Sequence, residues 1–364
     1  MTSRDGMYYA PQGKPQPVVG PGEFRFAAVH LDHGHIYGMT QGLLEAGGEI
    51  KYVYDPDAAK VEAFRKQFPQ AQPVDCLERI LDDPHIHLVA GAAVPSERGP
   101  LGCRVMKAGK DYFTDKTPFT SLDQLEEARR VVAATGRKYL VYYSERIHNE
   151  ASVFAGQLVQ QGAIGRVIQM IGLGPHRLMA PSRPAWFFEK AKYGGILCDI
   201  ASHQFEQFLF FTGATDATIT AATVGNFNNP KYPELEDFGE AHCIGNNGST
   251  AFIRVDWLTP DASRTWGDGR LFLLGTDGYI ELRKYVEVGR GEGGDQLYLV
   301  NHKVEEHYRL EGKVGFPFFG QLILDCLNRT ETAMTQAHAF KAAELCLKAQ
   351  QLARVLKPAG GSRN

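Results

Sequence analysis

Residues 24–55 have the sequence FRFAAVHLDHGHIYGMTQGLLEAGGEIKYVYD. The apolar run over Phe24–Val29 predicts a buried strand, and the apolar spacing over Ile36–Ala46 predicts a helix that ends at two glycines. A second strand follows and ends at Asp55, which lies 20 residues beyond His35. This order and spacing are typical of the βαβ unit that binds a dinucleotide, in which the acid accepts hydrogen bonds from the adenosine ribose.

The turn between the first strand and the helix lacks the glycines that such a unit usually carries. His30, Asp32 and His35 occupy the three glycine positions. A pyrophosphate can still bind the helix N-terminus, where free N–H groups and the helix dipole attract anions. We therefore expect Leu31, Asp32, His33 and His35 to contact the cofactor.

The histidines of this turn also support a second interpretation. His33 and His35 follow the first strand, with His30 and Asp32 nearby, and this arrangement resembles the opening metal ligands of amidohydrolase barrels. Such a barrel requires further histidines and an aspartate at later strand ends, and the downstream sequence does not supply them in order. The dinucleotide interpretation is therefore preferred, and no metal is predicted.

Strands and helices continue to alternate up to residue 146. The predicted helices span residues 57–68, 76–81, 96–108 and 122–135, and the next predicted strands span residues 87–92 and 138–143. Asp57 and Ser121 are the predicted caps of the first and last of these helices. The alternation predicts a doubly wound parallel sheet, a Rossmann-type domain over residues 23–146. Ligands bind at the carboxyl ends of such strands, where Asp55 and Lys116 are expected to lie.

The pattern changes after residue 146. A helix is predicted over residues 149–161, and glycine-rich turns separate seven predicted strands: residues 167–172, 217–224, 240–245, 250–257, 270–274, 279–283 and 296–300. These strands predict an α+β domain over residues 147–332, with a large, mostly antiparallel sheet. Closing helices are predicted over residues 318–329 and 337–356, the second within a C-terminal segment 333–358. Residues 1–22 are rich in glycine and proline and form an arm, either flexible or docked across a partner subunit, and Tyr8 and Tyr9 weakly favour docking.

A further amphipathic helix is predicted after Gly194 and Gly195. Apolar residues recur with helical spacing from Leu197 to Leu209. Asp199 and His203 lie four residues apart, so they project from the same side of this helix and present a carboxylate beside an imidazole. A buried histidine next to a surface carboxylate would produce the same pattern, and this structural interpretation stays open.

Three segments together resemble the Gfo/Idh/MocA family, named after glucose-fructose oxidoreductase, inositol dehydrogenase and rhizopine catabolism proteins. AGKDYFTDKTP at residues 108–118 is similar to the family's AGKHVxxEKP segment, and GGILCDIASH at residues 194–203 is similar to GGGxxxDxGxHxxD. GAIGRV at residues 162–167 resembles the GxIG segment that begins the second domain. The chain departs from the family at several positions: Val94–Ser96 in place of the TPNxxH loop, Asp115 in place of glutamate, Thr117 before Pro118, and Glu206 in place of the final aspartate.

The resemblance implies a nicotinamide-dependent oxidoreductase. Lys116 matches the active-site lysine, and Asp199 and His203 match the family's acid and histidine. The resemblance also implies that the C-terminal helix packs back on the nucleotide domain and that the open sheet joins chains into a homodimer or homotetramer. Four further cofactor contacts are implied: Ala93, Pro95, Asp115 and Lys116.

Substrate contacts are expected around residues 176–188, a loop rich in cations and aromatic rings. Arginine and histidine there can bind hydroxyls or a carboxylate, and a tryptophan offers a flat face to a sugar ring. A hydrophobic cover for a domain interface would have the same composition, and this alternative stays open. The expected substrate contacts are Tyr143, Arg146, His176, Arg183, Trp186, Asp199 and His203.

The expected chemistry is hydride transfer between a carbinol carbon and nicotinamide. It requires loss of the hydroxyl proton, and a base with a near-neutral pKa such as His203 serves this best. Asp199 would orient the imidazole, and Lys116 would stabilise the developing alkoxide. Asp55 favours NAD over NADP, because a 2′-phosphate would meet a carboxylate. An NAD-dependent dehydrogenase of a sugar, sugar acid or inositol is therefore expected.

Two other functional classes stay open. A redox glycoside hydrolase would oxidise its substrate transiently with NAD and eliminate the aglycone. A regulator on the same fold would bind a nucleotide without catalysis. Lys116, Asp199 and His203 favour catalysis, whereas the glycine-poor turn mildly favours a regulator.

The composition limits the partners. The chain has 364 residues, 43% of them hydrophobic and 22% charged, and a formal net charge of −3, as expected of a soluble protein with two domains that does not bind nucleic acid. No apolar run approaches the roughly 20 residues of a membrane span, and no signal-peptide core follows the N-terminus, so a cytoplasmic protein without a membrane partner is expected. The six cysteines form no Cys-x-x-Cys pair, which argues against a disulfide framework or a zinc cage.

Overall fold

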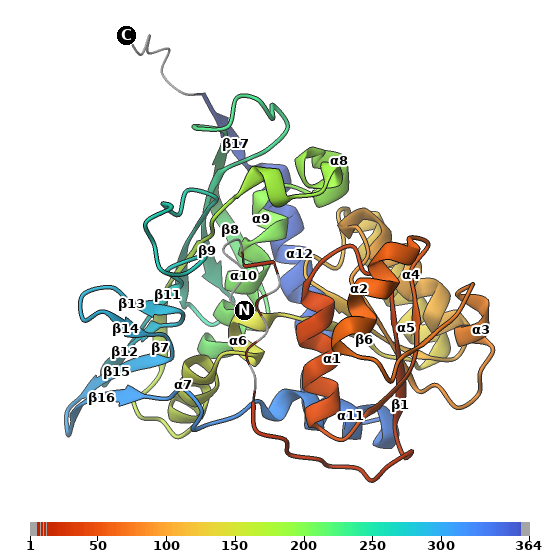
Figure 1. Cartoon of the computed structure of the whole chain (residues 1–364). Coiled ribbons are helices and arrows are strands. Elements are labelled where there is room, and N and C mark those ends of the chain that lie inside the picture. Colours follow the sequence, from red (N-terminus) through yellow and green to blue (C-terminus); the bar gives the residue numbers. More distant parts are fainter. Residues whose placement is uncertain (1–5, 8, 10, 12, 358–364) are drawn as a thin grey trace. The chain divides into compact units, whose positions relative to one another are not determined.

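The chain folds into two compact units in the computed structural model, which describes residues 6–7, 9, 11 and 13–357 (Figure 1). Met7–Tyr143 and Gly315–Phe340 form the first, here called the Rossmann unit. Ser144–Val314 and residues 341–357 form most of the second, here called the sheet unit. Residues 315–332, which the sequence places in the second domain, thus group with the first unit.

Six parallel strands form the sheet of the Rossmann unit, in the order β3-β2-β1-β4-β5-β6. The strands are β1 (Arg25–Val29), β2 (Glu49–Tyr54), β3 (Gln72–Pro73), β4 (Leu88–Gly91), β5 (Asp111–Asp115) and β6 (Tyr139–Tyr142). The helices between them are α1 (His35–Glu45), α2 (Ala58–Gln67), α3 (Glu78–Leu81), α4 (Pro95–Lys107) and α5 (Leu122–Thr135). The four strands β1, β4, β5 and β6 are almost entirely buried. This burial explains the nearly continuous apolar runs of β1, β4 and β6, whereas β5 also buries the polar residues Asp111, Thr114 and Asp115.

The predicted Rossmann-type sheet is confirmed, and the amidohydrolase barrel interpretation is wrong. The six strands form an open row that ends at β3 and β6, whereas a barrel requires its edge strands to pair with each other. Two predicted helix caps are also confirmed. The carboxylate of Asp57 accepts the N–H of Ala59 at 2.9 Å, and the hydroxyl of Ser121 accepts the N–H of Gln124 at 3.3 Å.

Part of the expected N-terminal arm packs on the Rossmann unit. The N–H groups of Gln16 and Val18 donate to the carbonyl oxygens of Glu45 and Ala46, at 2.9 and 3.0 Å. Val18 also lies against Gly320 of α11 (Pro317–Asn328). Residues 16–18 are therefore held by their own chain, and docking of the arm across a partner subunit stays a prediction. Tyr8, which the sequence suggested as a docking residue, lies outside the described residues.

Nine strands form the sheet of the second unit, in the order β16-β15-β12-β11-β7-β10-β9-β8-β17. All neighbours are antiparallel except the pairs β7–β10 and β8–β17, so the predicted mostly antiparallel sheet is confirmed. The strands are β7 (Val167–Pro175), β8 (Ala217–Gly225), β9 (Phe238–Gly245), β10 (Thr250–Asp256), β11 (Arg270–Gly275), β12 (Gly278–Arg283), β15 (Gln296–Asn301), β16 (Glu305–Arg309) and β17 (Arg354–Leu356). A separate ribbon pairs β13 (Val286–Glu287) with β14 (Glu292–Gly293).

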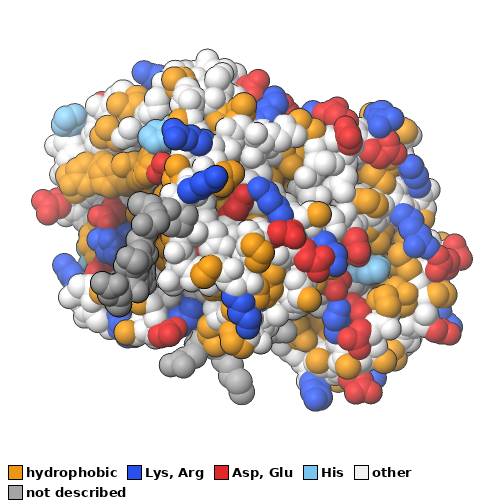
Figure 2. Space-filling model, turned by 90° about the horizontal axis from the view of Figure 1, so that it is seen from above, with side chains coloured by type: hydrophobic (Ala, Val, Ile, Leu, Met, Phe, Trp, Pro, Cys, Tyr) orange, Lys and Arg blue, Asp and Glu red, His pale blue; other side chains and the backbone are white. Residues whose placement is uncertain are grey.

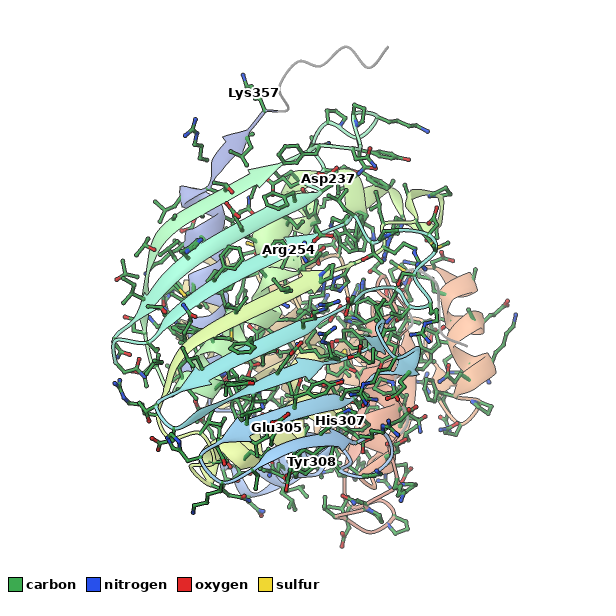
Figure 3. The ribbon with its side chains drawn as sticks, turned by 90° about the vertical axis from the view of Figure 1, so that its left-hand side faces the viewer. Asp237, Arg254, Glu305, His307, Tyr308 and Lys357 are labelled. Carbon is green, nitrogen blue, oxygen red and sulfur yellow. The ribbon has the colours of Figure 1, made fainter. Side chains whose placement is uncertain are left out.

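Helices cover one face of this sheet and leave the other open (Figure 3). The helices of the unit are α6 (Ser144–Ile147), α7 (Glu150–Gln160), α8 (Lys190–Tyr193), α9 (Ile196–Asp199), α10 (Ala201–Thr212) and most of α12 (Gln336–Leu352), with 3-10 turns η1 (Ala180–Ser182) and η2 (Ala185–Phe188). The helix α10 packs against β7 and β10. It approaches β7 closely because Gly172 and Gly174 carry no side chain where Gln204 lies.

Three expectations for this unit need correction. The helix predicted from Leu197 onward is divided into α9 and α10. At the break, the N–H of His203 bonds to the carbonyl of Ile200, three residues back, and the Ser202 hydroxyl donates a hydrogen bond to the carbonyl of Asp199. The last helix ends at Leu352 instead of residue 356, because residues 354–356 pair as β17 with β8. The strand β16 was not expected, because its sequence is polar and half exposed at the sheet edge.

The surface agrees with the near-neutral composition. On the face in Figure 2, acidic and basic side chains are interspersed, and neither sign forms a broad patch there. None of the helices in the described part of the chain is long and apolar enough to cross a membrane.

Candidate functional site

Asp55 holds the turn between β1 and α1. Its Oδ2 accepts the N–H of Leu31 at 2.6 Å, and its Oδ1 accepts the N–H of Asp57 at 2.8 Å. His30 opens this turn with a φ of 50°, in the left-handed region that favours glycine, so the backbone keeps a glycine-like conformation without a glycine. The Asp55 side chain is only 2% exposed, and its two hydrogen bonds to backbone N–H groups stabilise the turn.

Asp32 and Lys60 form the more exposed part of the same corner. The Lys60 Nζ lies 2.6 Å from Oδ1 of Asp32 and 3.8 Å from Oδ1 of Asp55. The Lys60 side chain is 36% exposed, whereas that of Asp32 is 16% exposed. Lys60 was missed by sequence reasoning, because a lysine on the exposed face of α2 carries no distinguishing pattern. A cation therefore stands beside the acids expected at the adenosine end of the cofactor.

The N-terminus of α1 is compatible with a dinucleotide. Gly34 is the cap residue, no side chain caps the helix, and no acid stands in its first turn, so no acidic group of that turn offsets the positive end of the helix dipole. Each oxygen of Asp55 accepts only one N–H and keeps capacity for a ribose hydroxyl. The residues present thus fit a nicotinamide dinucleotide, with the N-terminus of α1 for its phosphates and Asp55, Asp32 and Lys60 for its adenosine ribose.

His33 and His35 converge on Asp115 at the end of β5. Nδ1 of His35 lies 2.8 Å from Oδ1 of Asp115, and Nδ1 of His33 lies 2.9 Å from Oδ2. Burial lowers the pKa of His33 to about 3, against the opposing effect of Asp115. Burial alone would raise the pKa of Asp115, but His35, Arg98 and His33 together hold it well below its usual range. At neutral pH, His33 is therefore neutral and Asp115 ionised.

Arg98 ties the loop after β4 to the end of β5. Its Nε donates to the carbonyl of Ala93 at 2.7 Å, its Nη1 donates to the carbonyls of Lys116 and Thr117, and its Nη2 lies 3.2 Å from Asp115. The guanidinium is almost completely buried, so these bonds are protected from water. Arg98 was not predicted from the sequence. The feature that could have indicated it is its position in the first turn of α4, the helix that follows the end of β4. Arg98 thereby fixes the backbone that carries Lys116, itself 5% exposed.

Asp199 and His203 lie on α9 and α10 of the sheet unit, and both are buried. Gly195 begins α9 with a φ of 92°, and a Cβ there would collide with Gln350, whose Oε1 accepts the N–H of Leu197 at 3.0 Å. The glycine before the acid is therefore required by this turn and by α12. The carbonyl of His203 accepts a bond from Nε2 of Gln207. Lys116 belongs to the other unit.

A buried ion pair lies next to this helix. Nζ of Lys284 donates to Oε2 of Glu145 at 2.8 Å and to Oε1 of Gln207 at 2.6 Å, and Nε2 of Gln204 donates to the same Glu145 oxygen at 2.9 Å. Burial would raise the pKa of Glu145, but Lys284, together with the positive charge that His203 and His176 carry when protonated, lowers it to about 2. Glu145 is thus an anion within electrostatic reach of His203. Lys284 was missed, because nothing local in the sequence marks it as buried.

The loop over residues 176–188 is packed through most of its cationic side chains. The His176 ring lies against Trp257 and Trp266, and its Nδ1 is 3.1 Å from the carbonyl of Gly174. Arg183 donates to the carbonyl of Leu178 at 2.9 Å and stacks on Phe187 and Trp257. Trp186 is half-buried. Arg183 is thus packed within the sheet unit, and a substrate contact at His176, Arg183 or Trp186 stays a prediction.

Arg146 and Tyr143 have partners within their own units. Both carboxylate oxygens of Glu206 accept from Nε of Arg146, at 2.7 and 2.9 Å, and the guanidinium lies over the Phe210 ring. The Tyr143 hydroxyl donates to the carbonyl of Ala339 at 3.2 Å. Glu206, noted in the sequence only as a departure from the family, is therefore the charge partner of Arg146. Substrate contacts at Arg146 and Tyr143 stay predictions.

Two family models match the sequence. Residues 18–143 match the oxidoreductase family model with the NAD-binding Rossmann fold, and residues 153–281 match the GFO/IDH/MocA C-terminal domain. The structure is similar to the crystal structure of a putative oxidoreductase from Erwinia carotovora atroseptica SCRI1043, with a TM-score of 0.89, 49% identity, and 92% of this chain and 100% of that chain covered.

Two enzymes of known activity are more distant relatives. The D-xylose dehydrogenase of Paenarthrobacter nicotinovorans is 25% identical over 150 residues, which are 40% of this chain and 38% of that enzyme. The NAD(+)-dependent scyllo-inositol 2-dehydrogenase of Bacillus subtilis (strain 168) is 24% identical over 236 residues, which are 64% of this chain and 66% of that enzyme. The matches thus span from little more than a third to about two thirds of these relatives.

Proposed function

The chain belongs to the Gfo/Idh/MocA oxidoreductase family, and from this premise we propose that it transfers hydride between a carbinol carbon of a sugar, sugar acid or inositol and a nicotinamide dinucleotide. The observation that carries the proposal is the burial of the expected polar set. Lys116, Asp199 and His203 are 5%, 6% and 2% exposed. Burying a polar side chain costs desolvation free energy that an apolar side chain would avoid, so three buried polar residues of the types that the chemistry needs favour a functional role. The dehydrogenase activities of the distant relatives support the same class of substrate.

The cofactor proposed for this site is NAD. The N-terminus of α1 would bind its phosphates, and Asp55 and Asp32 would accept bonds from the ribose hydroxyls. When bound, the nicotinamide accepts the hydride from the substrate or returns it. The two acids favour NAD over NADP, whereas Lys60 between them reduces that preference.

The protein residues would move and stabilise the proton. His203 and Lys116 are the proposed proton-transfer pair, with the imidazole taking the hydroxyl proton as hydride leaves the carbon. Asp199 would orient the imidazole, and the buried anion of Glu145 would favour its protonated form. The Lys116 ammonium, on a backbone fixed by Arg98, would stabilise the developing alkoxide.

The test is a panel of sugars, sugar acids and inositols with NAD, followed by both NADH absorbance and product release. A dehydrogenase accumulates NADH in proportion to oxidised product. Release of aglycone from a glycoside without net NADH would instead identify a redox glycoside hydrolase. Tight dinucleotide binding without turnover of any panel member would favour a regulator and count against both enzymes.

A further inference from the structure

Three side chains of the Rossmann unit bring metal-binding atoms together. One imidazole nitrogen of His33, one of His35 and a carboxylate oxygen of Asp115 lie within 4.8 Å of one another. We propose that His33, His35 and Asp115 bind a divalent transition-metal ion. The proposal concerns ligand chemistry alone and does not depend on the hydride-transfer function.

The convergence follows from the fold. The two histidines flank Gly34, with His33 in the turn before α1 and His35 at its first position, and Asp115 ends β5, two strands away from β1 in the parallel sheet. The imidazole rings meet edge to face, with centroids 4.4 Å apart and an interplanar angle of 84°. The side chains of His33, His35 and Asp115 are 8%, 12% and 0% exposed, so the donor atoms are largely shielded from water.

The second observation is a buried oxygen without a hydrogen bond. Oδ2 of Asp115 accepts no well-directed hydrogen bond from any described residue, although Nδ1 of His33 lies 2.9 Å away and Nη2 of Arg98 lies 3.2 Å away. The N–H of His35 points at the same Nδ1 of His33, at 3.3 Å. A nitrogen that accepts this N–H carries no proton for Asp115. Two electron-rich atoms at this distance are best stabilised by a shared cation.

The ligand types indicate the class of metal. Two imidazole nitrogens and one carboxylate oxygen suit Zn²⁺ or Fe²⁺, and three protein ligands leave an open position for water or another molecule. Arg98 would orient the ligating carboxylate from behind, as outer groups do at metal sites. Because its guanidinium and the nearby Lys116 are cations, we expect an exchangeable ion instead of a permanent structural one.

The proposed ligands differ from those of the amidohydrolase interpretation. The His30 ring packs edge-on against Tyr54, and Asp32 forms an ion pair with Lys60. These two residues of the same turn are therefore outside the cluster. They provide matched controls, because His30→Ala and Asp32→Asn change the same turn and the same residue types.

The experiment is a metal titration of tag-free protein. The purified wild type is analysed for bound metals by mass spectrometry, stripped with a chelator, and titrated with Zn²⁺ by calorimetry and with Co²⁺ by visible absorption. We expect about one ion per chain and the ligand-field bands of a site with imidazole and carboxylate ligands. His33→Ala, His35→Ala and Asp115→Asn should each weaken Zn²⁺ binding about tenfold or more, and the two control variants should not.

The wild-type titration tests the proposal even where a ligand variant does not fold. Circular dichroism and thermal unfolding identify such a variant, and the remaining ligand variants are then compared. Wild-type protein that binds neither ion saturably overturns the proposal. Binding that is unchanged in every folded ligand variant also overturns it, because the ion then lies elsewhere. Neither result bears on the NAD-dependent activity, which the substrate panel tests separately.

Discussion

Nζ of Lys284 lies 2.8 Å from Oε2 of Glu145, and both side chains are almost completely buried. The pair connects α6, which contains Glu145, with the residue that follows β12, and its two members are 139 positions apart in the sequence. Gln204 and Gln207 of α10 bind the same two groups. The helix α10, which carries His203, is therefore bonded to Glu145 and Lys284 through a buried polar network. Each of these two charges offsets the desolvation cost of the other.

Lys284→Met is expected to destabilise the protein by about 3–5 kcal/mol, because it leaves the Glu145 carboxylate buried without its cation. Urea unfolding followed by tryptophan fluorescence measures the loss. Lys303→Met, at an exposed lysine of the same unit, is the matched control and should change little. The double variant Lys284→Met/Glu145→Gln should recover part of the loss; a double variant as unstable as the sum of both single changes would contradict the coupling.

Asp295 is expected to make the protein less stable as the pH rises. Burial raises its pKa to about 7, although its Oδ1 accepts from Asn149 and Ala151. The folded state thus holds the proton more tightly than the unfolded state, so this contribution is complete below about pH 4 and is lost by about pH 7. Asp295→Asn keeps the acceptor oxygen without the charge. Its unfolding midpoint should exceed that of the wild type at about pH 8 but not at about pH 4; an equal gain at both values would refute this assignment.

Asp32→Asn should shift the cofactor preference toward NADPH. The substitution removes the 2.6 Å partner of Lys60, whose exposed ammonium can then pair with a 2′-phosphate. The ratio of the NADPH and NADH affinities, measured by fluorescence titration, should change by up to about fivefold. Adding Lys60→Ala to the same chain should cancel the change. A shift that survives the double substitution would show that Lys60 is not the responsible cation.

Lys116→Ala and His203→Ala should each lower the turnover of the identified substrate about 10²- to 10⁴-fold at saturating cofactor. The expected loss follows from removal of the alkoxide-stabilising charge in one variant and of the proton acceptor in the other. Lys107→Ala and His302→Ala remove exposed residues of the same types and should leave turnover unchanged. Full activity in either site variant would refute the proposed pair.

Local patterns in the sequence predicted most of the secondary structure. Helical spacing and side-chain caps act over one or two turns, so the caps at Asp57 and Ser121 could be identified from a few residues. The strands β16 and β17 were missed because they are short edge strands without a clear strand pattern of their own. Pairing makes them strands: β16 pairs with the preceding strand β15, and β17 pairs with the distant strand β8. At the break between α9 and α10, the N–H of His203 bonds to the carbonyl of Ile200 and the Ser202 hydroxyl donates to the carbonyl of Asp199, and periodicity encodes neither bond.

The sequence could suggest site residues where a residue type matched a strand end or a motif, as for Asp55, Lys116 and His203, and their roles stay predictions. A site residue was not predictable where the decisive feature is a partner far away in the sequence. From the sequence alone, Arg98 could have been a surface arginine of α4. It is buried because β4 pairs with β5, which places Asp115 at the end of β5 within 3.2 Å of its guanidinium. For Asp55 the sequence suggested a ribose acceptor, and the structure adds a second role, because both oxygens already hold the turn.

The open face of the nine-stranded sheet carries an apolar row across three strands. Phe252, Ile171 and Phe272 are direct cross-strand neighbours on β10, β7 and β11, and the Phe272 ring stacks on Tyr279 of β12. Figure 3 views this face, which no helix of the described chain covers. Leu274 and Tyr279 are each 37% exposed, so contiguous apolar surface faces water in the single chain.

A second copy of the chain is the expected cover for this row, giving a homodimer or homotetramer. Phe272→Arg should weaken self-association by about 2 kcal/mol or more, because it places an unpaired charge at the centre of the apolar row. Light scattering after size-exclusion chromatography, over a dilution series, measures the change. Val288→Arg is the matched control, because Val288 is 60% exposed and lies on the ribbon between β13 and β14, outside the row. A wild type that stays monomeric at its highest attainable concentration, or a control that dissociates as readily as Phe272→Arg, would rule out the open sheet as the interface.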